Sequence, residues 1–451
     1  MSEINDTICA VATGNNPGAI GVIRISGKDA KEIVANHFSR DLSNAESHKS
    51  YFGLFSLEGE LIDEVLLTFF QTGKSYTGEE TIEIACHGSR YIQEKILSAL
   101  LKSGCRLAEP GEFTKRAFVN GKLDLSQAEA VADLIASSSK ASHDLALRQL
   151  RGGLSNTLKE LREKLINFAS LVELELDFSE EDVEFADRKE LVALVKEVLE
   201  YLEKTRDSFE LGNAIKEGVP VAIVGAPNTG KSTLLNLLLG EDRAIVSDIA
   251  GTTRDVIEET INIGGILFRL IDTAGIRESE DVIESIGIER SKKSIDKAKV
   301  VICMADASDS KSLVEVDSWG DELKVTHQQK HILKVANKLD LSTEKGSDRF
   351  TNISAKSGEG VEELKNRLVA SVEQGYDLEN DLILTNLRHK EAMDKTIDSL
   401  MAAYNGLITG VSGDFVAMDI RQAMFHLGSI TGEISTDDLL GNIFANFCIG
   451  K

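Results

Sequence analysis

The residues whose types and spacing most clearly indicate chemistry are Gly225-Ala226-Pro227-Asn228-Thr229-Gly230-Lys231-Ser232, which fit the pattern G-x-x-x-x-G-K-S. The apolar run before them, Val219–Val224, predicts a buried strand, and the run Ser232–Leu239 after them predicts a helix that we expect to stop at Gly240. In this context the loop's backbone N–H groups surround phosphates, the lysine reaches the outer phosphates, and the serine hydroxyl ligates Mg²⁺. We therefore expect the nucleotide phosphates to be bound by Asn228, Thr229, Gly230, Lys231, Ser232 and Thr233.

A second motif indicates which base is bound. The apolar run His331–Ala336 ends in Asn337-Lys338-Leu339-Asp340, the pattern N-K-x-D at the carboxyl end of a predicted strand. An aspartate there accepts hydrogen bonds from guanine N1–H and N2–H₂, a donor pair that adenine lacks, so the pattern predicts GTP rather than ATP. We expect the base to be flanked by Ser354, Ala355 and Lys356, and a closing helix to run from Gly360 to Leu368.

Two further segments would respond to the terminal phosphate. The strand-like Leu270-Ile271 leads into Asp272, Thr273, Ala274 and Gly275, whose carboxylate would hold Mg²⁺ through water and whose glycine would sense the phosphate. The segment Ser247, Asp248, Ile249, Ala250, Gly251, Thr252 and Thr253 would bring the Thr253 hydroxyl to the same Mg²⁺ as Ser232. Phosphate loop, switch segments and N-K-x-D occur in the order that a GTPase domain requires.

The chain departs from small signalling GTPases directly after D-T-A-G. Ile276 stands where a glutamine usually orients the attacking water, so another group must take that role. Asn228 has two interpretations: its amide oxygen, with Ser247, Ile249 and Thr252, cages a K⁺ ion beside the phosphates, or it only braces the loop.

The elements that must position these residues follow from changes in periodicity. Residues 1–118 combine short β-type runs (Ala19–Ile25 and Val65–Phe70) with a helix around Gln93–Lys102, which predicts an α+β domain. Helical spacing dominates residues 119–214 and 376–451, so we expect the GTPase domain, 215–375, to be inserted into a helical domain. The fold class expected is therefore multidomain, α/β and α, with a mostly parallel sheet in the GTPase domain.

Composition limits the kinds of partner and compartment. The net charge of −24 over 451 residues disfavours stand-alone binding of RNA phosphates, so any contact with RNA must be local or shared with a partner. The five cysteines form no C-x-x-C pair, which indicates a reducing compartment. Without a basic leader or an apolar run of about 20 residues, we expect a cytoplasmic protein.

Several motifs together carry a resemblance to a known family. They are Gly251-Thr252-Thr253-Arg254-Asp255, Ile286–Arg290, Tyr76–Glu80, Pro110–Phe118 and the final Cys448-Ile449-Gly450-Lys451. From end to end the chain resembles the MnmE (TrmE) family of tRNA-uridine-modification GTPases, within the TrmE-Era-EngA-like group.

The resemblance implies a fuller activity. It implies a homodimer in which K⁺-stimulated hydrolysis follows dimerisation of the GTPase domains, and it implies that Glu284 positions water, although its charge pattern alone suggests only a solvated acid. It implies that the N-terminal domain binds 5,10-methylene- or 5-formyl-tetrahydrofolate through Arg24, Glu83, Lys122 and Lys451. Cys448 is either a reactive thiol or part of the cofactor clamp, where the residue type alone suggests a small buried side chain.

The implied product is an aminomethyl or carboxymethylaminomethyl group at C5 of wobble uridine in tRNA, made with the flavoprotein MnmG (GidA). Two other function classes stay open from the residues alone. One is a purely regulatory GTPase whose N-terminal domain recruits partners, and the other is a self-sufficient folate-dependent methyltransferase. Because the chain has no G-x-G-x-x-G dinucleotide fingerprint, the redox step that the modification needs points to a second subunit.

Overall fold

A computed structural model describes residues 6–14, 18–177, 188–242, 259–271, 292–342, 347–373, 376–378, 381–434, 437–445, 447–448 and 450. By contacts the chain divides into two compact units. The first is residues 1–132, 149–163 and 424–451, and the second is residues 133–148 and 164–423. Among the helices that these ranges contain, none is both long and apolar enough to span a bilayer.

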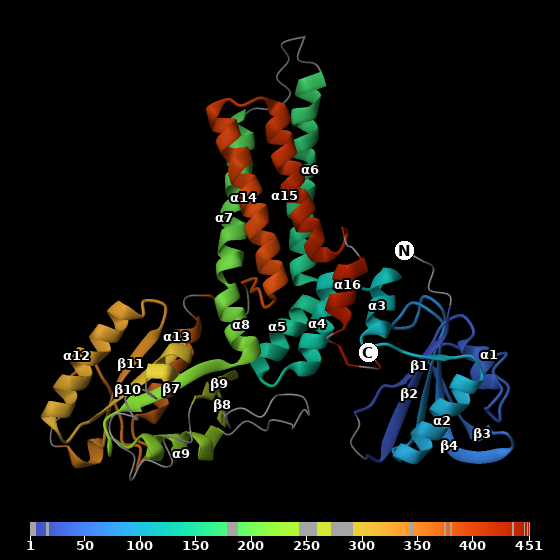
Figure 1. The fold of residues 1–451 in the computed structure, drawn as a ribbon, viewed down its shortest axis with the longest axis horizontal. Coiled ribbons are helices and arrows are strands. Elements are labelled where there is room, and N and C mark those ends of the chain that lie inside the picture. The colour runs from blue at the N-terminus through green and yellow to red at the C-terminus, as the bar shows by residue number, and fades with distance from the viewer. Residues whose placement is uncertain are drawn as a thin grey trace. The chain divides into compact units, whose positions relative to one another are not determined.

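Sheet A of the first unit is almost wholly antiparallel, with the order β3-β4-β5-β2-β1-β6. Its strands are β1 (Ile8–Val11), β2 (Ile20–Ser26), β3 (Lys49–Leu57), β4 (Glu60–Phe70), β5 (Thr81–His87) and β6 (Arg106–Leu107). Alternate residues of β5, Ile82 and Ile84, are fully buried in the core that α1 (Ala30–Ala35) and α2 (Arg90–Lys102) complete on one face (Figure 1). The intervening residues, Glu83 among them, therefore belong to the opposite face.

The first unit also carries shorter helices, α3 (Glu112–Val119) and α16 (Asp437–Phe444), and the start of α4 (Leu125–Ala136). α3 begins after Gly111, whose φ of +67° and close approach to the backbone of Phe444 leave no room for a side chain. The chain end returns here, since the Gly111 N–H donates to the Cys448 carbonyl at 3.3 Å. The Cys448 side chain is exposed, unlike the small buried side chain that its residue type alone would suggest.

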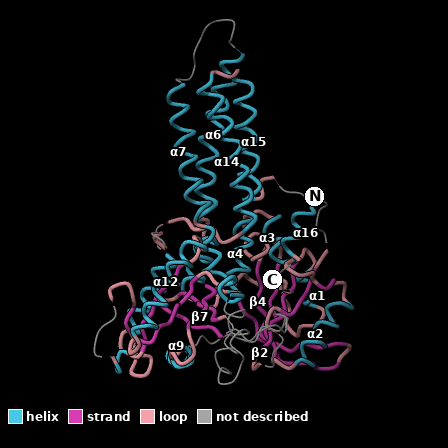
Figure 2. The backbone as a smooth tube through the Cα atoms, turned by 60° about the vertical axis from the view of Figure 1, so that its left-hand side comes forward, coloured by secondary structure: helices cyan, strands magenta, loops and turns pink. Residues whose placement is uncertain are grey.

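Long helices form the helical part of the chain. They are α5 (Lys140–Leu150), α6 (Gly153–Asp177), α7 (Arg188–Asp207), α8 (Phe209–Glu217), α14 (Leu387–Thr409) and α15 (Gly413–Thr431). Within the second unit, α6 from residue 164, α7, α14 and α15 up to residue 423 run side by side in both views (Figures 1 and 2). After sheet B and its helices, the helical part of the chain resumes at Leu387 with α14.

Sheet B has the order β12-β11-β10-β7-β9-β8 and is parallel except for the β8–β9 pair. Its strands are β7 (Val219–Gly225), β8 (Glu259–Ile263), β9 (Ile266–Leu270), β10 (Val300–Asp306), β11 (His331–Asn337) and β12 (Thr351–Asn352). It is accompanied by α9 (Lys231–Asp242), α12 (Ser310–Thr326), α13 (Val361–Glu373) and the short 3₁₀ helix η2 (Leu339–Leu341).

The expected fold class is confirmed: an α+β sheet domain, a helical domain and a mostly parallel sheet consistent with an inserted GTPase domain. The expected helix stop at Gly240 is wrong, because α9 continues to Asp242. A glycine inside a helix costs only about 1 kcal/mol relative to alanine. Buried Leu234, Leu235 and Leu238 anchor α9 on the core and offset that cost.

Candidate functional site: a nucleotide cleft and an arginine–glutamate pair

The phosphate loop connects β7 to α9 at a reversal of strand order. From β7 the sheet continues to β9 on one side and to β10 on the other, and ligands of parallel α/β sheets bind at such a switch point. Gly230 has a φ of +95°, and a Cβ there would collide with the side-chain amide of Asn337. The glycine thus allows the loop to lie against the end of β11, the second strand from β7 in the sheet.

Lys231 opens α9 and points back over the loop. Its Nζ donates to the carbonyls of Gly225 and Ala226, both at 2.9 Å, and burial lowers the pKa of its amine. Ser232 and Thr233 follow in the first turn of the same helix. The Lys231 amine and the N–H groups at the start of α9 suit a phosphate group, whose negative charge would favour the protonated form of the amine.

Asn337 links the phosphate loop to the loop after β12. Its Nδ2 donates to the Thr229 carbonyl at 2.8 Å, and its Oδ1 accepts from the Ala355 N–H at 2.9 Å. Asn337 is only 2% exposed, so both hydrogen bonds are shielded from water. The structure therefore brings together three segments that lie far apart in the sequence.

The two residues after Asn337 that carry charge are also held in place. Ser354 Oγ donates to Asp340 Oδ1 at 2.7 Å, which fixes the carboxylate that the sequence assigns to the base. Lys338 has a left-handed φ of +70°, and its Nζ lies 2.6 Å from Asp306 Oδ2. Lys356 follows Ala355 in the turn beyond β12.

The remaining nucleotide-site predictions lie outside the described residues. These are Ser247, Asp248, Ile249, Ala250, Gly251, Thr252, Thr253, Asp272, Thr273, Ala274, Gly275 and Glu284. Asn228 is described: its φ of +61° lies in the left-handed region, which asparagine tolerates better than most residues.

A second candidate site lies on sheet A. Arg24 on β2 and Glu83 on β5 are cross-strand partners, and Arg24 Nη2 lies 2.8 Å from Glu83 Oε1. The Arg24 guanidinium lies 5.5 Å from the ring centroid of Tyr76 and 5.6 Å from that of Phe113, so aromatic rings flank it. Its Nη1 also donates to the Gly450 carbonyl at 3.5 Å.

Lys122 and Lys451 are the other two residues that the resemblance assigns to folate binding. Lys122 Nζ donates to the Gly73 carbonyl at 3.0 Å, and no contact with Arg24 or Glu83 is described for it. The structure thus joins Arg24 to Glu83 but does not join Lys122 to them. Lys451 lies outside the described residues.

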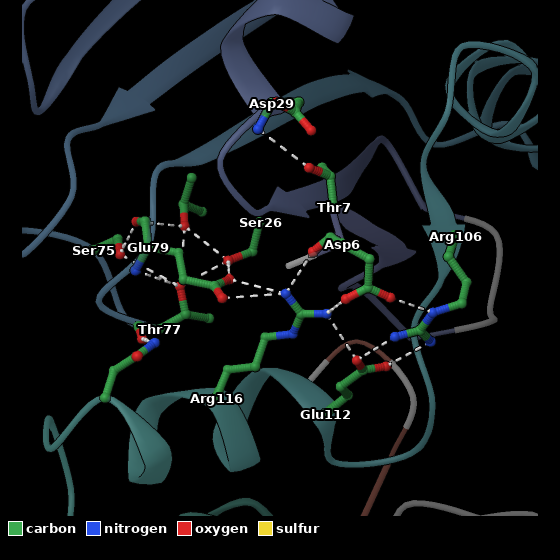
Figure 3. Close-up of polar contacts among 12 residues, drawn as sticks. Asp6, Thr7, Ser26, Asp29, Ser75, Thr77, Glu79, Arg106, Glu112 and Arg116 are labelled. Carbon is green, nitrogen blue, oxygen red and sulfur yellow. Dashed lines mark hydrogen bonds and ion pairs between the residues drawn. The ribbon is translucent and has the colours of Figure 1, made fainter. Parts of the chain in front are cut away.

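Sequence reasoning missed a buried charge cluster around Arg116 (Figure 3). Arg116 is fully buried and pairs with Asp6 Oδ1 at 2.7 Å, Glu112 Oε1 at 2.9 Å and Glu79 Oε1 at 3.2 Å. Arg106 Nη2 approaches Glu112 to 2.6 Å from the other side. Burial alone would raise the pKa of Glu112, but hydrogen bonds from Arg106, the Glu109 N–H and Arg116 outweigh it, and that pKa is lowered.

This cluster supports the second candidate site. Glu79 also accepts from Ser26 Oγ at 2.7 Å, and Ser26 is the last residue of β2, the strand that carries Arg24. Thr114 Oγ1, two residues before Arg116, lies 2.9 Å from the hydroxyl of Tyr76, one of the rings beside Arg24. The sequence signals for the cluster were the motifs Tyr76–Glu80 and Pro110–Phe118, which contain Glu79, Glu112 and Arg116 without indicating that they lie together.

Comparison with known proteins assigns the family. The family described as "GTP-binding protein TrmE N-terminus" matches residues 7–122, and "MnmE helical domain" matches residues 125–448. The chain is 51% identical to the tRNA modification GTPase MnmE of Christiangramia forsetii, over 100% of both chains. It is 52% identical to that of Flavobacterium johnsoniae and 51% identical to that of Bacteroides fragilis, each over 99% of both chains. With relatives this similar over its full length, the chain belongs to the MnmE family of tRNA modification GTPases.

Proposed function

We propose that the protein binds and hydrolyses GTP in the cleft of sheet B and uses this activity in tRNA modification. The observation that carries the proposal is the pair of buried hydrogen bonds by which Asn337 joins Thr229 of the phosphate loop to Ala355 of the base-flanking loop. These hydrogen bonds hold together the segments that we propose bind phosphate and guanine, beside the strand order reversal where nucleotides bind in such sheets.

Ions complete the site in this proposal. Mg²⁺ is bound by the hydroxyls of Ser232 and Thr253, and it neutralises charge on the phosphates. K⁺ is bound by Asn228 with Ser247, Ile249 and Thr252 when the GTPase domains dimerise. Glu284 orients the attacking water, the role that Ile276 cannot fill.

The sheet A site binds a tetrahydrofolate derivative. Glu83 offers a carboxylate to the donor edge of a pterin, and Arg24 offers a cation between two aromatic rings. Lys122 and Lys451 take part through the glutamate end of the cofactor, and Cys448 serves as a thiol near the same site. The described contact between Arg24 and the Gly450 carbonyl supports the participation of the chain end.

The protein acts as a homodimer. Apolar side chains on the outer face of sheet A are exposed: Ile20 by 65%, Phe52 by 52% and Leu66 by 44%. Phe52 and Leu66 are cross-strand partners, so they form part of one continuous surface. An apolar sheet face of this kind is typical of an interface, and a second copy of the chain is the occupant we propose.

The modification itself takes place on wobble uridine at C5, in complex with the flavoprotein MnmG, which supplies the redox step. The domains are residues 1–118, 119–214, 215–375 and 376–451, and the complex works in the cytoplasm. The described cysteines, all of them free thiols, support a reducing compartment.

Two measurements test the proposal: nucleoside analysis of tRNA from cells that lack the protein, and GTP turnover by the purified protein. Wobble uridines from cells that lack the protein should lose the aminomethyl and carboxymethylaminomethyl groups, as measured by mass spectrometry of nucleosides. A Lys231→Ala copy should fail to restore them, while a Lys102→Ala copy, which removes an exposed lysine of α2, should restore them. Unchanged nucleosides would refute the tRNA role, and GTP turnover by purified Lys231→Ala equal to that of wild type would refute the GTPase site.

A further inference from the structure

Asp306, the last residue of β10, lies beside the nucleotide cleft and belongs to none of its motifs. β10 is between β7, which leads into the phosphate loop, and β11, which leads into Asn337 and Lys338. Asp306 and Asn337 are register partners, so the two strands end side by side. The side chain of Asp306 therefore lies between the strand that leads into the phosphate loop and the strand that leads into Lys338.

Lys338 reaches across to this aspartate. Its Nζ lies 2.6 Å from Asp306 Oδ2, so its side chain extends from the end of β11 toward β10, the direction in which the phosphate loop lies. The lysine and aspartate side chains are 28% and 19% exposed, so water covers the pair only in part. The four-carbon stem of Lys338, between its backbone and the paired ammonium group, is apolar.

The Asp306 carboxylate is oriented by hydrogen bonds other than the one to Lys338. Asp306 Oδ1 accepts from the N–H of Ser308 at 2.9 Å and from its Oγ at 2.6 Å. The Asp306 N–H donates to Ser312 Oγ at 3.0 Å, at the start of α12. One oxygen is thus committed to the turn after β10 and the other to Lys338, which leaves the carboxylate a single orientation.

We propose that Asp306 is a positioning residue for nucleotide binding: it holds the Lys338 stem in the place where the stem contacts the face of the guanine base. This inference rests on the proposed GTP site. A free lysine side chain would lose conformational entropy when a base packs on it, because its rotamers become restricted. The ion pair with Asp306 has already removed part of that freedom, so nucleotide binding costs less.

The test measures GDP binding by full-length protein with a fluorescent GDP analogue in Mg²⁺ buffer. Asp306→Asn keeps the size of the side chain and removes its charge, and it should weaken GDP binding about tenfold, mainly through faster dissociation. Asp309→Asn is the matched control, because Asp309 caps α12 through the Lys311 N–H at 3.0 Å and does not contact Lys338. It should bind GDP like wild type.

A double-mutant cycle separates positioning from a general effect on the fold. If Asp306 acts through Lys338, then Asp306→Asn adds nothing to Lys338→Met, and the double variant binds GDP as Lys338→Met does. The ratio of GDP to IDP affinity should stay at the wild-type value in Asp306→Asn, because Asp340 reads the guanine amino group. Additive losses, or a changed GDP to IDP ratio, would overturn the proposal.

Two further outcomes are distinguishable. If wild-type protein does not bind GDP, the proposed GTP site fails; if wild type binds and Asp306→Asn binds equally well, only the positioning role fails. Should Asp306→Asn not fold, Ser308→Ala removes the Oγ hydrogen bond that orients the carboxylate and leaves the ion pair residues in place. It should weaken GDP binding by about threefold, and unchanged binding would contradict the role of Asp306.

Discussion

The side-chain amide of Asn337 donates to the main-chain carbonyl of Thr229, at 2.8 Å, across 108 positions of sequence. Asn337→Ala would leave the Thr229 carbonyl and the Ala355 N–H without this partner in a buried place, a loss of about 1–3 kcal/mol. We expect weaker GDP binding and a lower melting temperature before nucleotide is added. Calorimetric titration and thermal unfolding measure the two effects.

A second asparagine of the same sheet provides the control. Asn262 lies on β8, at the edge of sheet B opposite β12, and Asn262→Ala should leave GDP affinity unchanged. If Asn337→Ala binds GDP as tightly as wild type does, the hydrogen bonds that link the two loops contribute nothing to GDP binding.

The strands that carry the candidate nucleotide site were largely predictable, because each is an apolar run that ends in a short motif. β7 ends at Gly225 and β11 at Asn337, as those runs indicate. The pairing of Lys338 with Asp306 was not predictable, because nothing local to either residue reveals that their strands are neighbours. Gly240 was misread since tertiary packing of α9 outweighs a small local preference.

The sheet A site was predictable only through the family resemblance. Arg24 and Glu83 are ordinary charged residues 59 positions apart, and only the β2–β5 register makes them partners. Arg116 escaped notice because arginine is almost never fully buried unless it is paired, and pairing with Asp6 depends on contacts across 110 positions.

The left-handed backbone of Asn228 allows a pair of variants to distinguish the two interpretations of this residue. Asn228→Gly accepts a φ of +61° without strain, whereas Asn228→Ala pays roughly 1 kcal/mol for it. If the amide binds K⁺, both variants lose the stimulation of GTP hydrolysis by K⁺ over Na⁺. If the residue only braces the loop, Asn228→Gly keeps that stimulation. Steady-state hydrolysis in K⁺, Rb⁺ and Na⁺ gives the answer, with Rb⁺ expected to replace K⁺.

Glu284 is predicted to orient the attacking water. Glu284→Ala should bind GTP and GDP normally and lose kcat on the order of 10²-fold, the usual effect of removing a positioned general base. Single-turnover hydrolysis in saturating K⁺ measures the chemical step. Glu280→Ala is the matched control from the same acidic segment, and a loss in Glu280→Ala with full activity in Glu284→Ala would move the role to Glu280.

The Arg116 cluster predicts how acid affects the stability of the first unit. The pKa of Glu112 is lowered in the folded protein, so its contribution is present above its ordinary value of 4.5 and is lost as the pH falls through the lower folded value. Glu112→Gln should destabilise the protein by about 3 kcal/mol near pH 7, with a smaller difference from wild type below about pH 4.

Thermal unfolding across this pH range provides the measurement. Glu46→Gln is the control, because the Lys49–Glu46 pair, at 2.7 Å, has side chains that are 58% and 67% exposed. Exposed pairs contribute about 0–1 kcal/mol, so this variant should follow wild type at every pH. A Glu112→Gln difference that does not shrink in acid would mean that the ionised carboxylate is not the stabilising form.

From the Arg24–Glu83 pair we predict that a change at Glu83 weakens folate binding without affecting GTP hydrolysis. Glu83→Ala removes the carboxylate proposed for the pterin and leaves Arg24 without its partner, so binding should weaken by about 2–5 kcal/mol. Glu83→Gln keeps the shape and loses the charge, and a comparable loss would assign the effect to charge. Glu94→Ala is the matched control: it breaks an ion pair with Arg90 of the same 2.8 Å length, between two exposed side chains of α2. Calorimetric titration with 5-formyltetrahydrofolate should show wild-type affinity for Glu94→Ala and unchanged GTP turnover in all three variants. Wild-type folate affinity in Glu83→Ala would place the cofactor elsewhere, because no ligand that uses this carboxylate could tolerate its removal.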